Sequence, residues 1–198
     1  MFDYKDTEYL QHKTRMPVLL AFLNLFYYIC REKSKRQMAM KKIINPYLGV
    51  SREEGYHCFA CAPKNEHGLH MEFYEDGDDV VCFWTPKEHF QGWTNTLHGG
   101  IQATLIDETA GWVIARKMQT SGMTTNFNIK YKRPIPTTEG TNIEIRARIR
   151  EMKRNFAFME ATIECGGEVC TTAELTFYCF PQEKAKEEFH FMPYEVEE

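Results

Sequence analysis

The residues best suited to chemistry lie in one short stretch, where His98-Gly99-Gly100 is followed seven positions later by Asp107. If a helix begins at the two glycines, its first N–H groups have no partners within the helix and lie at the positive end of the helix dipole. Such groups stabilise an oxygen that gains negative charge, and a glycine lets that oxygen approach because it has no Cβ. We therefore expect Gly99 and Gly100 to form an oxyanion hole. The alternative is a glycine pair that serves only close helix–strand packing.

Asp107 lies four residues after Ala103 and three before Ala110, so it shares a helix face with small apolar side chains. Partly dehydrated surroundings favour a raised pKa and a more reactive carboxylate. We predict that Asp107 is the catalytic carboxylate, which either attacks directly or activates water; a surface charge is the alternative. Glu108 lies about 100° further round the helix, and we expect it to be solvated.

The spacing of these two features predicts an assembly. Asp107 is seven residues past Gly100, which corresponds to a rise of about 10 Å along a helix. One carbonyl group cannot lie within about 3 Å of both the helix start and that side chain. Two chains that pair antiparallel, each helix start facing the partner's aspartate, would form two composite sites in a two-fold dimer.

The loop before this helix carries further polar side chains. We expect Gln91 and Asn95 to orient a substrate carbonyl or a water molecule, although capping the helix is an alternative role for Asn95. His98 directly precedes the helix, and we expect it to order the loop. Trp93, with Trp112 and Phe127, could line a pocket or belong to the core.

The elements that position these residues follow from the apolar pattern. One long helix is predicted from Gly99 to Met118, because its apolar side chains cover a broad stripe. Strand-like runs precede and follow the helix, and residues 86–98 read as a loop; the runs are His70–Glu75, Asp79–Thr85, 123–132, 141–151, 155–165 and 168–180. One helix among consecutive hairpins predicts an α+β fold, in which a curved antiparallel sheet wraps around the helix.

The length and composition set the boundaries. The chain has 198 residues, of which 43% are hydrophobic, and a net charge of −4, which argues against a nucleic-acid binder. Seven cysteines, an odd number, favour free thiols and a cytoplasmic location over a disulfide framework. We expect residues 41–181 to form the domain and 182–198 a charged, loose tail.

Residues 1–40 are expected to be an N-terminal extension, either helical or a non-native start, because Met40 opens a sensible sequence of its own. Within the extension, Met16 to Cys30 is apolar apart from Asn24 but shorter than the roughly 20 residues of a membrane span. We expect this segment to dock on the domain or to lie at a membrane surface, with no stable insertion.

The stretch from His89 to Glu108 resembles the signature of PaaI-like thioesterases in the hotdog superfamily. The resemblance lies in Gln91-Gly92, His98-Gly99-Gly100 and Asp107. Cys58-Phe59-Ala60-Cys61-Ala62-Pro63-Lys64-Asn65 with Gly68-Leu69, and Tyr131-Lys132-Arg133-Pro134, are similar to other stretches of that family. The resemblance covers about residues 55 to 180.

The resemblance implies a hotdog fold, hydrolysis of an acyl-CoA thioester to a free acid and CoA, no cofactor, and a homodimer or homotetramer with shared sites. Thr124 matches a position where related thioesterases keep a hydroxyl that holds water, although an ordinary strand threonine is the alternative. We expect basic side chains to meet the CoA phosphates, unless they form a solvated strand face; these are Lys130, Lys132 and Arg133.

Cys58 and Cys61 form a Cys-x-x-Cys pair, the spacing of half a zinc site. The nearby histidines, His57, His67 and His70, fit no standard zinc-finger spacing, and the family resemblance implies a loop without metal. We therefore predict no metal site.

Two other functions remain open. One is a hotdog dehydratase or hydratase, since His89-Phe90-Gln91-Gly92 is faintly similar to the loop of acyl-carrier-protein dehydratases; however, Ala103 stands where that family has its acid. The other is a module that binds acyl-CoA without turnover. Ligand binding that is unchanged by Asp107→Asn would favour this function.

Shared sites predict complementation between inactive chains. An Asp107→Ala chain mixed with a chain whose helix start is inactivated should regain part of the activity, because one site of the mixed dimer keeps both intact halves. Thiol release from acyl-CoA measures this gain. Absence of rescue in verified heterodimers would count against sharing.

Overall fold

The computed structural model describes residues 40–50 and 55–197. The apolar segment at residues 16–30 lies outside the described residues. Lys41–Glu198 forms one compact unit. Within the described ranges, no helix combines the length and apolar character needed to cross a membrane.

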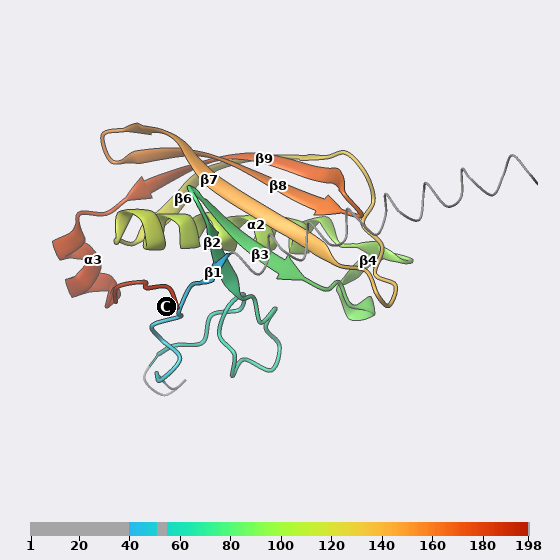
Figure 1. Cartoon of the computed structure of the whole chain (residues 1–198), viewed down its shortest axis with the longest axis horizontal. Helices are drawn as coiled ribbons and strands as arrows, with labels where there is room; N and C mark the ends of the chain where they lie inside the picture. The colour runs from blue at the N-terminus through green and yellow to red at the C-terminus, as the bar shows by residue number, and fades with distance from the viewer. Residues whose placement is uncertain (1–39, 51–54, 198) are drawn as a thin grey trace, which may run out of the picture. The chain divides into compact units, whose positions relative to one another are not determined.

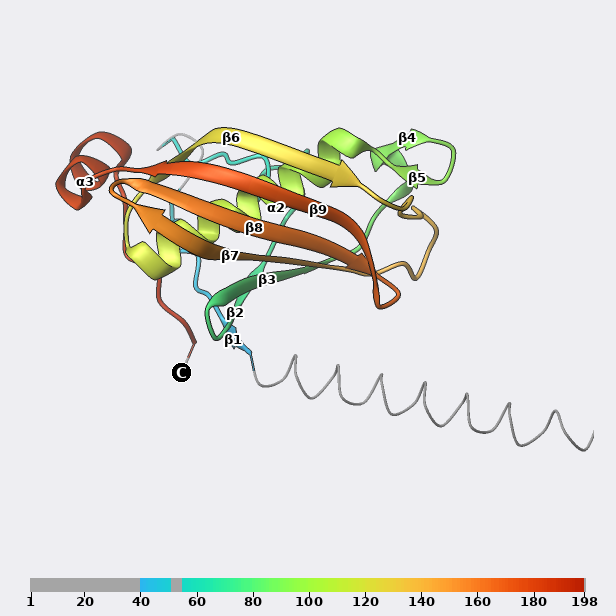
Figure 2. The same ribbon diagram turned by 90° about the horizontal axis from the view of Figure 1, so that it is seen from above.

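The unit is a seven-stranded antiparallel sheet with one long helix packed on it, the α+β hotdog plan (Figures 1 and 2). The strand order is β1-β2-β3-β7-β8-β9-β6, so β6 forms one edge. The strands are β1 (Lys41–Lys42), β2 (Phe73–Asp76), β3 (Asp79–Trp84), β6 (Gly122–Tyr131), β7 (Ile143–Lys153), β8 (Phe156–Cys165) and β9 (Glu168–Cys179). The six predicted runs are confirmed as strands, with ends that differ by up to three residues.

The helix α2 (Gly99–Val113) continues into a π-helical turn, η2 (Ile114–Met118), so the predicted helix from 99 to 118 is confirmed. Its apolar side chains are buried on several sides because the strands cross above it (Figure 2). Leu105, Ile106 and Ala110 are fully buried. The helix ends at Gln119, which adopts a left-handed conformation with φ 51°.

The residues of the turn between β2 and β3 favour a tight hairpin. In the β2–β3 hairpin, Asp76 pairs with Asp79 across a two-residue turn, and Gly77 takes the positive φ of 61° that such a turn requires. Arg146 of β7 fastens this hairpin, because its guanidinium lies 2.8 Å from Asp76 and 2.6 Å from Asp79.

Residues 86–98 are more ordered than the predicted loop. They contain a 3₁₀ turn, η1 (Glu88–Phe90), and a small hairpin of β4 (Gln91–Trp93) and β5 (Thr96–Leu97). The pattern hid this hairpin because its strands are only two and three residues long.

The prediction of a loose tail after Pro181 is wrong. Gln182–Phe189 forms the helix α3, and the chain then returns so that Val196 pairs with Ile43 (Figure 1). Two apolar side chains, Ala185 and Phe191, anchor the segment against Ala115 and Tyr194. The high charge of this segment belongs to its outer face.

This packing makes Phe191 a test of the C-terminal segment. Phe191→Ala should lower the free energy of unfolding by about 3 kcal/mol, the usual cost of truncating a buried phenylalanine. Urea denaturation measures the change, and Phe189→Ala is the matched control because Phe189 is 41% exposed. Equal losses in the two variants would contradict the packing.

Candidate active site

The start of α2 is held by two side chains. His98 is the N-cap, and its Nδ1 accepts a hydrogen bond of 2.9 Å from the Gly100 N–H. The Tyr131 hydroxyl of β6 donates to the Gly99 carbonyl at 2.8 Å. Partial burial raises the pKa of this hydroxyl, which favours the protonated form that donates the hydrogen bond. The helix start is therefore fixed to both the loop and the edge strand.

The histidine cap determines which N–H groups at the helix start are free to bind a substrate oxygen. The Gly100 N–H, which we predicted to face the substrate, is already bonded to His98 in this chain. Within the described residues, the N–H groups of Gly99 and Ile101 have no acceptor. These two groups, rather than Gly99 and Gly100, are the donors that the helix start leaves open.

Asp107 and Thr124 meet between α2 and β6. The Thr124 hydroxyl donates a 2.6 Å hydrogen bond to Oδ1 of Asp107, and both side chains are half-buried. The pairing of β6 with β9 shifts between Thr124 and Asn126, an irregularity that lies beside this contact. The carboxylate is thus oriented through one oxygen, which leaves Oδ2 for a substrate or a water molecule.

The predicted loop residues serve the loop itself. The Gln91 side chain accepts a 2.9 Å hydrogen bond from the Asn95 N–H, and Oδ1 of Asn95 accepts one of 3.0 Å from the Thr137 N–H. Asn95 has a left-handed φ of 52° and does not cap α2. Gln91 and Asn95 also line a hollow of about 640 Å³ beside β4.

The three predicted basic residues are not brought together. Side chains alternate along β6, so Lys130 faces away from the helix side that Tyr131 occupies. It lines a hollow of about 360 Å³ on the sheet with Arg148. Arg133 forms an ion pair with Glu168, and Lys132 is exposed.

The three aromatic residues that could line a pocket also lie in different environments. Trp112 is 4% exposed and stacks on Phe73 with ring centroids 4.1 Å apart, so it belongs to the core. Trp93 is 80% exposed, and Phe127 is half-buried.

The prediction that Glu108 is solvated is wrong. Glu108 is half-buried, and its Oε1 accepts from Trp112 Nε1 at 3.0 Å and from Cys58 Sγ at 3.7 Å. The reason is that the loop around Cys58 covers this face of α2. The sequence did not indicate that Tyr131 would hold the start of α2 through its hydrogen bond to Gly99. The sequence signal for Tyr131 was its place in the family-like stretch Tyr131–Pro134.

Residues 94–172 match the family model of the thioesterase superfamily. The chain is 33% identical over 107 residues to the acyl-coenzyme A thioesterase THEM4 of Rattus norvegicus, a match that covers 52% of the chain and 45% of that protein. The chain therefore spans about half the length of this curated relative.

Solved structures share the fold. A thioesterase protein from Streptococcus pneumoniae with coenzyme A has a TM-score of 0.52 and 20% identity, covering 57% of this chain and 90% of that one. A thioesterase superfamily protein from Shewanella loihica has a TM-score of 0.51 and 20% identity, covering 66% of this chain and 100% of that one. The likeness to these structures shows the hotdog fold, and the match to the thioesterase superfamily model is confined to residues 94–172.

The cap at the helix start is testable by stability. His98→Ala should lower the free energy of unfolding by about 1 kcal/mol, because the Gly100 N–H loses its acceptor, and His98→Asp should restore part of it. Thermal and urea denaturation measure both changes. His89→Ala is the matched control, since that ring lies before the helix and does not cap it. Equal stability of wild type and His98→Ala would contradict the cap.

Proposed function

We propose that this chain is an acyl-CoA thioesterase that hydrolyses a thioester to a free acid and CoA. The observation that carries the proposal is the hydrogen bond between Thr124 and Asp107, which orients a half-buried carboxylate on a helix whose start offers open N–H groups. The family match and the curated relative supply the reaction class.

The reaction needs an electrophile and a nucleophile. The thioester carbonyl oxygen accepts from the amides at a helix start, so the negative charge that develops on it is stabilised. Oδ2 of Asp107 either takes a proton from water as the water adds to the carbonyl carbon, or attacks that carbon itself. In both cases the C–S bond breaks and CoA leaves as a thiolate that gains a proton. Where water attacks, the free acid forms directly; where Asp107 attacks, an acyl–Asp107 anhydride forms, and water then hydrolyses it to the free acid and the free carboxylate.

Each site in this proposal combines two chains. The helix rise of about 10 Å between Gly100 and Asp107 separates the two halves within one chain, so the open donors of one protomer serve the carboxylate of its partner. The edge strand β6 carries Thr124 and Tyr131, and so links both halves to one sheet edge. A homodimer is the minimum unit, and a homotetramer built from two dimers is compatible with it.

We propose a PaaI-like subfamily, a cytoplasmic location, and a domain that begins near residue 41 and includes the C-terminal segment packed on it. The CoA phosphates would meet Lys132, an exposed basic side chain just beyond the end of β6. His98 would act by shaping the helix start, and Gln91 and Asn95 by shaping the hairpin that precedes it.

The two alternative functions are less well supported. A dehydratase would need an acid at position 103, and Ala103 supplies none. A binding module without turnover would need no oriented carboxylate, whereas Thr124 fixes the carboxylate of Asp107. Release of free thiol, compared with hydration of an enoyl thioester, separates the two enzymatic readings.

Asp107→Asn should lower kcat about 100- to 10,000-fold, because an amide is neither a base nor a nucleophile of comparable strength. A panel of acyl-CoAs with a thiol-reactive dye measures kcat and also identifies the preferred acyl group. Asp78→Asn is the matched control, since Asp78 lies in an exposed turn. Full activity of Asp107→Asn would contradict the proposal.

Thr124→Val should lower kcat about 10- to 100-fold, the equivalent of one hydrogen bond to a charged group, while Thr124→Ser keeps most of the rate. The comparison distinguishes the hydroxyl from the bulk of the side chain. The same loss in both variants would assign Thr124 a packing role only.

A further inference from the structure

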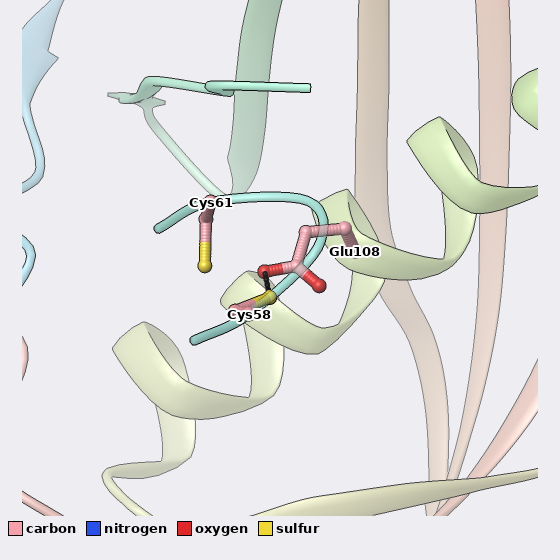
Figure 3. Close-up of side chains that lie close together, drawn as sticks. All are labelled: Cys58, Cys61 and Glu108. Carbon is pink, nitrogen blue, oxygen red and sulfur yellow. Dashed lines mark hydrogen bonds between the residues drawn. The ribbon is translucent and has the colours of Figure 1, made fainter. Parts of the chain in front are cut away.

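A cluster of side chains of types that can bind metal lies on another face of α2, where Glu108 is about 100° round the helix from Asp107. It consists of Cys58 and Cys61 on a loop and Glu108 on the helix, with one ligand atom from each residue all within 4.8 Å of one another. Figure 3 shows both cysteines on the loop that passes over α2, with Glu108 reaching toward them. Neither the proposed hydrolysis nor the core packing requires two thiols and a carboxylate to converge.

The distances suit a zinc-sized ion. Two thiolates bound to tetrahedral zinc lie roughly 3.8 Å apart, and a thiolate and a carboxylate oxygen about 3.5 Å apart, given bonds of about 2.3 and 2.0 Å. Cys58 Sγ and Glu108 Oε1 are 3.7 Å apart. The three groups therefore need to move by no more than about 1 Å to enclose the ion.

The surroundings hold the ligands in place. Cys61 is 8% exposed, and the Tyr56 hydroxyl lies 3.2 Å from its sulfur. Trp112 donates to Glu108 at 3.0 Å, the kind of outer hydrogen bond that orients a ligating carboxylate. The loop itself is fixed, because the Asn65 side chain donates to the Cys58 carbonyl at 3.3 Å.

We propose that Cys58, Cys61 and Glu108 bind one divalent cation of the zinc type per chain. Thiolates select zinc over magnesium or calcium, and three protein ligands leave the fourth position of a tetrahedral site for a water molecule or another ligand. The sequence pattern does not indicate such a site because the Cys-x-x-Cys pair has no second pair nearby in the chain; the proposed third ligand comes from α2, 47 residues beyond Cys61. Through Glu108, the ion would join the loop to the helix that carries Asp107.

Binding can be measured on the full-length wild-type chain, first reduced and stripped with a chelator. Equilibrium dialysis against Zn²⁺ should retain one ion per chain, and Co²⁺ should give the thiolate charge-transfer band and the intense visible absorption of a tetrahedral site. Zn²⁺ should also protect Cys58 and Cys61 from alkylation, as read by peptide mass spectrometry. All three readouts use the native sequence, so they do not depend on whether a variant folds.

Variants then assign the ligands. Cys58→Ser and Cys61→Ser should each weaken Zn²⁺ binding by at least about 100-fold, beyond the 10- to 100-fold typical of losing an outer-shell group, and Glu108→Gln should weaken it measurably. Cys165→Ser and Glu164→Gln, placed at the β8–β9 turn, are the matched controls and should leave affinity unchanged.

Three outcomes would overturn the proposal. One is a reduced wild-type chain that retains no Zn²⁺. Another is bound Zn²⁺ that leaves alkylation of Cys58 and Cys61 unchanged. The third is the formation of a Cys58–Cys61 disulfide in air, together with the absence of a tetrahedral Co²⁺ spectrum from the reduced chain. None of these bears on thioester hydrolysis, which is measured separately.

Discussion

The burial of α2 against the sheet is the constraint on which the rest of the structure depends. Because Leu105, Ile106 and Ala110 are fully buried, the rotation of the helix about its axis is fixed. Once that rotation is set, the direction of every polar side chain on the helix is set as well. Asp107 must then face β6, and the helix start must lie beside the loop that carries His98.

Two adjacent acids on this helix meet different neighbours. Asp107 accepts from Thr124 of the edge strand, whereas Glu108, about 100° further round, accepts from Trp112 and Cys58. A half-buried carboxylate needs such donors to offset its lost hydration. One helical turn therefore presents a carboxylate for the proposed hydrolysis on one side and a carboxylate for the proposed cation on the other.

The fold was predictable because its signals are local and periodic. The alternation in β7 and the broad apolar stripe of α2 identify a sheet and a buried helix without reference to tertiary contacts. The same reasoning failed for Glu108, since its environment is created by a loop 50 residues away. It also gave no indication that the Gly100 amide donates to the side chain of His98, the residue that caps the helix. In the C-terminal segment, a high charge concealed two apolar anchors, Ala185 and Phe191.

The most direct test of the central claim is a crystal structure of the wild-type chain with a non-hydrolysable thioether analogue of acyl-CoA. A carboxylate oxygen of Asp107 should lie within about 3.5 Å of the carbon that replaces the thioester carbonyl, or one water molecule away, with the helix start of the partner subunit on the other side. An analogue bound elsewhere, with Asp107 facing only Thr124 and bulk solvent, would contradict the role assigned to this helix.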